Sequence, residues 1–153
     1  MDLPLFIKQL EKLQPTLEKE LDAIVLDDKL ELVDLNKEQL SKGQSADETP
    51  LSTAGYSVRH KAARIKRGRP VNYVDFKYTG KFYASLVFKK ISRGIYQIVS
   101  TDKTKDKVPY LVHYAETYGG SGEIFGLNKE NADKKEKEYA GKIVDKIVNF
   151  FSK

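Results

Sequence analysis

The stretch "YASLVFKKISRGIYQIVST" (Tyr83 to Thr101) contains two strand-like segments separated by a short turn. "YASLVFKKI" and "GIYQIVST" are both rich in β-branched and aromatic residues, as half-buried strands are. The intervening "SRG" places a glycine where a tight hairpin turn needs one. The two segments therefore predict an antiparallel β-hairpin.

Three further segments extend this pattern. "VNYVDFKY" (Val71 to Tyr78) alternates, and "VPYLVHYAETY" (Val108 to Tyr118) is another candidate strand, although "LVHYAETYG" is equally compatible with a helix. "KLELVDLN" (Lys29 to Asn36) alternates Leu with polar residues and also predicts a strand. Because short turns join the neighbouring segments, we expect an antiparallel sheet of three to five strands.

Both ends of the chain predict helices. Near the N-terminus apolar residues recur at steps of three and four, with Pro15 expected to kink the helix or restart it. Asn128 is a natural N-cap for a closing helix, whose first half "NKENADKKEKE" is expected to be solvated. Only the second half of that helix has an apolar face. The N-terminal stripe comprises Leu3, Phe6, Leu10, Leu13, Leu17, Leu21 and Ile24, and the C-terminal face comprises Tyr139, Ile143, Val144, Ile147, Val148, Phe150 and Phe151.

Composition limits the fold class and the setting. A chain of 153 residues fits one domain, 1–153, and we expect an α+β fold with the antiparallel sheet packed against the N- and C-terminal helices. No apolar run is long enough to cross a bilayer, so no membrane partner is expected, and the first residues lack the pattern of a signal peptide. The absence of Cys excludes disulfides and thiolate chemistry, which suits a protein made in a reducing cytosol.

Positive charge is concentrated in the segment "SVRHKAARIKRGRP", residues 57–70. It contains six cations and no carboxylate, so the remainder of the chain, within a total of +5, carries a net charge of −1. Such a patch suits phosphates or an acidic partner, and its lack of interleaved aromatics argues against reading of bases. The alternative interpretation is a solvated loop or helix face. The segment predicts one or two helical turns, ended by Gly68 and Pro70. The candidate contact residues are Arg59, Lys61, Arg64, Lys66, Arg67 and Arg69.

Two segments have the composition of loops. Residues from about 41 to 55 are rich in Gly, Ser, Asp and Pro and predict a mobile loop. Residues 119–126 form a Gly-rich connector that lacks the Lys of a phosphate-binding loop and the dinucleotide fingerprint. We expect both segments to become ordered on assembly with other chains.

The sequence offers no constellation for catalysis. His60 and His113 are the only histidines, and neither has a nucleophile or a metal-ligand partner at a recognisable spacing. We therefore expect no enzymatic activity, no cofactor and no metal.

The stretch "DFKYTGKFYASLVF" (Asp75 to Phe88) resembles a motif shared by tail-completion and head–tail connector (neck) proteins of tailed bacteriophages. A Thr-Gly pair is followed by a bulky residue and then by a small or hydroxyl residue. The longer stretch from "LNKEQLSKG" through "TGKFYAS" resembles structural proteins of phages that infect Bacteroides-like hosts. The resemblance assigns the motif or an interface to Thr79, Gly80, Phe82, Tyr83 and Ser85, and an assembly loop to Gly119, Gly120, Gly122, Phe125 and Gly126.

The likeness covers about Leu35 to Leu127, with two departures. "DFKY" replaces a Pro that commonly precedes the Thr-Gly, and "ETYGGSGEIFG" replaces an acidic-Phe-Gly-Thr ending. Independently of the family, Gly80 permits a tight turn, and Phe82 and Leu86 are expected to anchor the next element in the core while Ser85 faces neighbouring backbone.

The resemblance implies a structural virion protein, made in the host cytoplasm and placed in the virion. It implies a homo-oligomeric ring that completes the tail or joins it to the head, with other phage head–tail proteins and non-specific double-stranded DNA in the channel as partners. The alternative is a small cytosolic nucleic-acid-binding accessory protein that uses the patch at 59–69.

Overall fold

A computed structural model describes residues 3–51, 56–77, 79–102 and 123–152. Helices occupy both ends of the chain, and two antiparallel strands lie between them, so the fold is mixed helix and strand. The elements are α1 (Leu3–Asp27), α2 (Lys29–Ser41), α3 (Val58–Ile65), α4 (Lys81–Ala84), β1 (Leu86–Ser92), β2 (Ile95–Ser100) and α6 (Lys129–Phe151).

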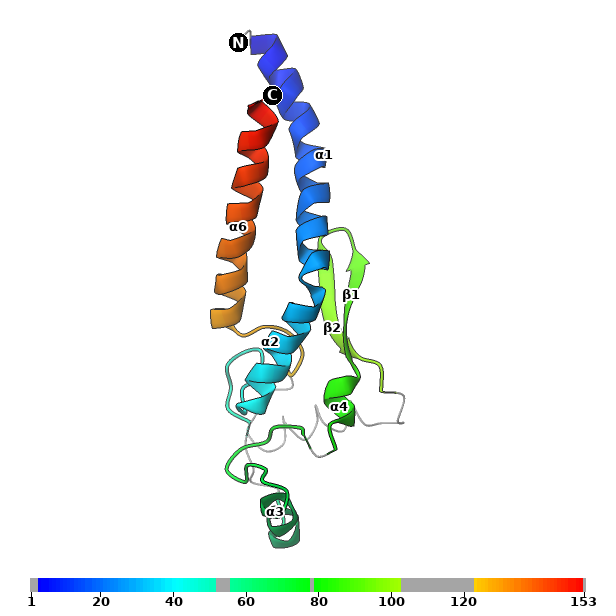
Figure 1. Cartoon of the computed structure of the whole chain (residues 1–153), viewed down its shortest axis with the longest axis vertical. Coiled ribbons are helices and arrows are strands. Elements are labelled where there is room, and N and C mark those ends of the chain that lie inside the picture. The colour runs from blue at the N-terminus through cyan, green and yellow to red at the C-terminus, as the bar shows by residue number, and fades with distance from the viewer. Residues whose placement is uncertain (1–2, 52–55, 78, 103–122, 153) are drawn as a thin grey trace.

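The molecule is elongated (Figure 1). Helices α1 and α6 run side by side in opposite directions, so the two termini lie at the same end. Helix α2 continues from α1, and the β-hairpin lies beside this junction. Helix α3 lies at the end opposite the termini.

The predicted hairpin is confirmed. Strands β1 and β2 pair antiparallel, with Leu86 opposite Ser100 and Lys90 opposite Tyr96, and the register is irregular between Lys90 and Ser92. Gly94 adopts φ +69°, the left-handed conformation that the turn requires. The first strand begins three residues later than the sequence pattern suggested, because residues 81–84 form the helical turn α4.

Two predicted strands are wrong. Residues 29–36 belong to helix α2, where burial of Leu32, Val33, Asn36, Gln39 and Leu40 follows a helical period, with Leu30 left 72% exposed. The leucines of this segment alternate with polar residues as in a strand, but they lie on a helix.

Residues 71–77 form no strand either. Val74, Asp75 and Phe76 are buried in succession, and Phe76 has φ +50°, so neither the burial nor the backbone is that of a pleated strand. The candidate strand at 108–118 lies outside the described residues.

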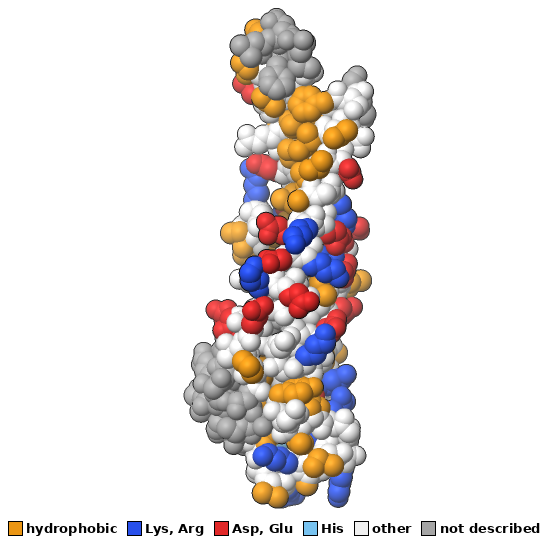
Figure 2. Space-filling model, turned by 90° about the vertical axis from the view of Figure 1, so that its left-hand side faces the viewer, with side chains coloured by type: hydrophobic (Ala, Val, Ile, Leu, Met, Phe, Trp, Pro, Cys, Tyr) orange, Lys and Arg blue, Asp and Glu red, His pale blue; other side chains and the backbone are white. Residues whose placement is uncertain are grey.

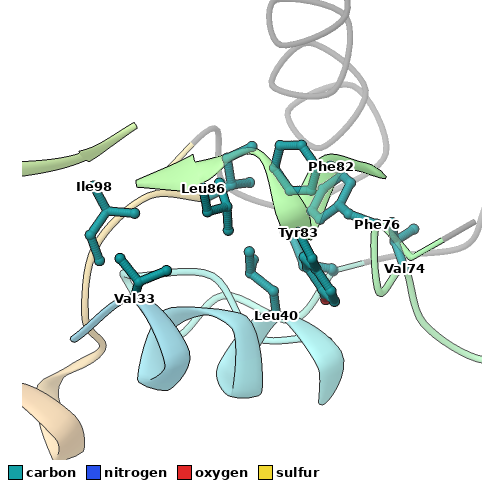
Figure 3. Packing of buried hydrophobic residues seen from close by; sticks show 10 residues of the cluster. Val33, Leu40, Val74, Phe76, Phe82, Tyr83, Leu86 and Ile98 are labelled. Carbon is teal, nitrogen blue, oxygen red and sulfur yellow. The ribbon is translucent and has the colours of Figure 1, made fainter. Parts of the chain in front are cut away.

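The hydrophobic core lies between α2, α4 and the hairpin. Figure 3 shows Val33 and Leu40 of α2 beneath side chains from the hairpin and α4. The sheet is thus covered by the helix that had been predicted as a strand, and α6 packs along α1 instead. Helix α1 meets the hairpin through polar pairs of Asp22 with Lys90 and Tyr96. The core residues are Val33, Leu40, Leu51, Val74, Phe76, Phe82, Tyr83, Leu86, Ile98 and Ile124.

The expectation of a fully solvated first half of α6 is wrong at Lys135. This side chain is 3% exposed, and its Nζ lies 2.9 Å from Asp28, 2.7 Å from Glu31 and 2.8 Å from Glu138. Burial acts to lower the pKa of Lys135, but the hydrogen bonds to Glu138, Glu31 and Asp28 outweigh burial and raise it. The charged half of α6 is therefore fastened to the α1–α2 junction by an ion-pair cluster.

This cluster predicts a specific acid sensitivity. Hydrogen bonds from Lys135 and Lys142 lower the pKa of Glu138 from 4.5 to about 2. Because the folded-state value is the lower one, the contribution to stability is complete above pH 4.5 and is lost as the pH falls towards 2. Thermal melts followed by circular dichroism should therefore give wild type a higher melting temperature than Glu138→Gln at neutral pH. The difference in melting temperature should shrink as the pH is lowered. The exposed control Glu11→Gln should follow wild type throughout, and a gap for Glu138→Gln that persists at low pH would contradict the prediction.

Candidate functional site

Helix α3 carries most of the basic segment and confirms the predicted helical turns. Its N-cap is Ser57, whose Oγ accepts a hydrogen bond of 3.2 Å from the backbone N–H of His60. The helix ends before Gly68, whose φ of +62° turns the chain away. The side chain of His60 stacks on Tyr56, with ring centroids 4.5 Å apart.

Arg64 does not belong to the exposed cationic surface. Its side chain is 2% exposed, with Nη2 donating to Asp75 Oδ1 at 2.7 Å and Nε donating to the carbonyl of Pro70 at 2.7 Å. Its guanidinium also lies over the ring of Tyr56, 5.2 Å from the centroid. The structure therefore corrects the sequence prediction, because Arg64 is a buried ion-pair partner and is inaccessible to a phosphate.

Asp75 links this arginine to the core. Its Oδ1 also accepts a hydrogen bond of 3.0 Å from the backbone N–H of Lys77, and its carbonyl accepts one from the hydroxyl of Tyr83. Burial raises the pKa of Tyr83, so the hydroxyl remains a donor at neutral pH. Helix α3 is thus held by a chain of hydrogen bonds that runs from Arg64 through Asp75 to Tyr83.

The other five predicted contact residues remain on or near the surface of this end of the molecule. Side chains of Arg59, Lys61, Lys66 and Arg67 are exposed, and Arg69 is half-buried. We call the exposed part of α3 and the turn after it, residues 58–69, the basic tip. In Figure 2 cationic and hydrophobic side chains lie together at this end of the molecule.

The hydrophobic side chains of the basic tip are a feature that sequence reasoning missed. Val58 is 86% exposed and Ile65 is 63% exposed, although apolar residues in a helical pattern are expected to face a core. Their spacing of seven residues was visible in the sequence and would have placed them on one face.

A second exposed surface lies on the long helices near the termini. Lys146 of α6 pairs with Glu20 of α1 at 2.8 Å, so this side of α6 faces α1. Residues two positions before and after Lys146 point to the far side of an α-helix, and these are Val144 and Val148, exposed by 55% and 57%. We call the exposed apolar side chains of α1 and α6, apart from Leu26 beside the α1–α2 junction, the terminal apolar face; they are Ile7, Leu10, Leu21, Val144, Val148 and Phe151.

Figure 2 shows a stripe of hydrophobic side chains along the upper part of the molecule, above a belt of mixed charges. The sequence indicated the apolar face of α6 and the stripe of α1, and it predicted that the sheet packs against these two helices. Within the described residues, α1 is the only element against which α6 packs extensively. The side of α6 that points away from α1 is therefore exposed to solvent.

Two of the residues assigned to the phage-like motif, Phe82 and Tyr83, belong to the core. Phe82 and Tyr83 are 3% and 8% exposed, and Gly80, with φ +85°, begins α4. Thr79 is exposed, and its Oγ1 accepts from the backbone N–H of Lys81 at 3.4 Å. Ser85 bonds to the carbonyl of Phe82 at 2.6 Å and to the hydroxyl of Ser100 at 2.7 Å. These contacts hold the turn to the hairpin, so their visible role is structural.

The predicted assembly loop is described only at its C-terminal end. Gly119, Gly120 and Gly122 lie outside the described residues. The ring of Phe125 packs against that of Phe82, with centroids 6.3 Å apart. The carbonyl of Gly126 accepts hydrogen bonds from Asn36 at 2.8 Å and from Gln39 at 2.7 Å. This end of the connector is therefore fastened to α2.

The described part of the loop at 41–55 is also hydrogen-bonded. Gln44 and Pro50 form an isolated bridge, and Ser45 Oγ donates to the carbonyl of Thr49 at 2.8 Å. Leu51 is 1% exposed and belongs to the core. Residues 52–55 lie outside the description.

An apolar cavity of about 560 Å³ lies between the hairpin, the α1–α2 junction and the segment before α6, and Tyr139 of α6 also lines it. Its lining includes Val25, Phe88 and Tyr96. Burial and a hydrogen bond to Asp22 raise the pKa of Tyr96 to about 12, so this hydroxyl does not titrate near neutral pH. Nothing in the lining pairs a nucleophile with a base.

Among the described residues, no group of three or more acidic, His or Cys side chains is arranged to hold a metal ion. The same part of the chain contains no helix with the length and apolarity needed to cross a bilayer. His113 lies outside it.

No family model, curated protein or solved structure matches the chain. The features of the molecule that bear on function are the two exposed surfaces and the residues of the phage-like motif.

Proposed function

We propose that this protein is a non-enzymatic structural subunit of a tailed-phage virion, which oligomerises at the neck or tail to complete the tail or to join it to the head. The observation that carries the proposal is the pair of exposed surfaces at opposite ends of an elongated body. The basic tip lies at one end, and the terminal apolar face lies on the helices at the other (Figure 1).

The terminal apolar face supplies the reason for oligomerisation. Six large apolar side chains on α1 and α6 are between 39% and 57% exposed, and a contact between chains that covers them removes apolar area from water. A second copy of the chain offers the same two helices, and two helical pairs that meet on such faces form a bundle with a shared core. The occupant of this face in our proposal is therefore another copy.

Ring closure gives the basic tip its effect. One tip carries few cations and binds an anionic surface weakly, but a closed ring presents the same tip many times. Weak contacts then add through repetition, without any requirement for recognition of bases. In the same proposal, the sheet of three to five strands is completed by pairing between copies along the outer edges of β1 and β2.

The proposal predicts that polar substitutions on the terminal apolar face disrupt assembly. The double variant Val144→Ser with Val148→Ser should require at least about ten times more protein to oligomerise, because it removes apolar area from the contact. Native mass spectrometry and light scattering, with the protein alone and with a portal-ring preparation, measure this directly. Leu30→Ser is the matched control, because Leu30 is 72% exposed but lies on α2. A wild-type chain that stays monomeric in both settings would overturn the proposal.

The four exposed cations of the basic tip favour a second candidate, a small nucleic-acid-binding accessory protein. In that case the isolated chain should bind a duplex tightly, with a logarithmic salt slope of up to about −4 for four to five neutralised phosphates. Charge reversal at Arg59, Lys61 and Lys66 should abolish that binding. As a connector subunit, the isolated chain should bind duplex only feebly at about 0.15 M salt.

A further inference from the structure

The outer face of α3 combines apolar side chains with positive charge. Val58, Ala62 and Ile65 follow one another at steps of four and three, so they share one face of the helix, and all three are exposed. Lys61 lies at the margin of this face, and Lys66 follows it directly in the chain. The result is a short apolar stripe bordered by cations.

The opposite side of α3 is already occupied. Arg64 turns inward over the ring of Tyr56 and continues to Asp75, while His60 stacks on the same ring and stays exposed. The buried pair of Arg64 with Asp75 therefore fixes the orientation of the helix before any partner arrives, and Val58, Ala62 and Ile65 are left exposed on the other side. Such preorganisation reduces the conformational entropy that a binding partner must overcome.

A nucleic-acid backbone does not explain this face. Phosphates offer negative charge and hydrogen-bond acceptors, which suit the lysines and arginines but leave Val58 and Ile65 without a partner. A protein segment with carboxylates around apolar side chains is complementary to both features. Apolar contact at the centre with charge pairing at the rim is the usual organisation of a protein–protein interface.

We infer that the outer face of α3 is a docking site for an acidic protein segment that carries apolar side chains, and that nucleic acid is not its partner. This inference rests on the proposed function, in which a neighbouring virion protein supplies that segment. A helix of eight residues is about 12 Å long, so one contact is small and each copy binds weakly. A ring of copies compensates by multiplicity.

The test compares three probes on the full chain at about 0.15 M salt. The first is an amphipathic peptide of Glu and Leu about 14 residues long, the second is the same peptide with Ser in place of Leu, and the third is a duplex of about 20 base pairs. Fluorescence anisotropy measures all three. Wild type should bind the Glu/Leu peptide at least about ten-fold more tightly than the Glu/Ser peptide, and more tightly than the duplex.

The decisive variant is Val58→Ser with Ile65→Ser. It should remove the preference for the Glu/Leu peptide and leave the weak duplex binding unchanged, because it alters no charge. Both side chains are exposed, so the melting temperature should stay near that of wild type, and Leu30→Ser serves as the control for loss of an exposed apolar residue elsewhere. Equal affinity for the two peptides, or duplex binding tighter than binding of the Glu/Leu peptide, would overturn the inference.

These measurements separate the inference from the proposed function. Peptide binding is measured on the isolated chain and does not depend on assembly, whereas native mass depends on the terminal apolar face. A chain that stays monomeric with the portal ring but prefers the Glu/Leu peptide retains the docking site and loses the connector role. A chain that assembles but shows no peptide preference retains the connector role and loses the docking site.

Discussion

Replacing Phe82 with Ala should lower the free energy of unfolding by about 3–5 kcal/mol, because the substitution removes a buried ring and leaves a cavity. Phe82 is 3% exposed, and its ring lies against three others: the centroids of Phe76 and Tyr83 are both 6.0 Å away, and that of Phe125 is 6.3 Å away. It therefore joins α4 to the segment before α6 through Phe125, and to the segment before α4 through Phe76. Urea unfolding followed by circular dichroism measures the loss.

The matched control is Leu30→Ala, which shortens a side chain that is 72% exposed and should change stability by less than about 0.5 kcal/mol. The comparison also tests the role of the phage-like motif. If Phe82 contacted a neighbouring subunit, Phe82→Ala would leave the isolated chain stable and impair only assembly. That outcome would contradict the structural role that its burial indicates.

Short sequence signals were sufficient to predict the turns and helix ends, whose deciding residues lie close together in the chain. The glycine at position 94 and the strand-forming residues on either side specify the hairpin, and Asn128 caps α6 through a bond from the backbone N–H of Asn131 at 3.0 Å. Gly68 similarly ends the helical turns of α3, as its place in the sequence predicted. In each case the deciding residues lie within a few positions of one another.

The helix α2 was not predictable in this way, because its environment comes from distant parts of the chain. Its buried polar residues Asn36 and Gln39 bond to the backbone of residues 124 and 126, which lie more than eighty positions away. Lys135 is buried for the same reason, since its partner Asp28 belongs to the other end of the sequence. From the sequence alone, polar residues such as these are predicted to be exposed to solvent, because their distant partners are not known.

The sequence predicted the position of the positive charge in the candidate site, but it did not predict which of these side chains are exposed. Composition alone located the cluster of cations, and the structure keeps most of them exposed. Composition did not distinguish Arg64 from its neighbours, because its partner Asp75 lies in a segment that had been predicted as a strand. The exposure of Val58 and Ile65 was equally hidden, since it depends on α3 having no helix packed against its outer face in the described structure.

Removing either member of the Arg64–Asp75 pair should cost about 3–5 kcal/mol of unfolding free energy, because the remaining charge is left buried without compensation. The two side chains are 2% and 5% exposed. Arg64→Ala and Asp75→Ala should therefore shift urea unfolding far more than Arg59→Ala, which removes an exposed cation from the same helix and should stay within about 0.5 kcal/mol of wild type.

The double variant Arg64→Met with Asp75→Leu separates loss of charge pairing from loss of packing. Apolar residues leave no buried charge behind, so this variant should recover part of the stability that either single variant loses, although the backbone N–H of Lys77 and the carbonyl of Pro70 lose their partners. It should not recover full binding of the Glu/Leu peptide, because the bond from Arg64 to Pro70 is also lost and α3 is held less firmly. Single variants as stable as Arg59→Ala would contradict this account, since they would mean that the buried pair does not hold the basic tip in place.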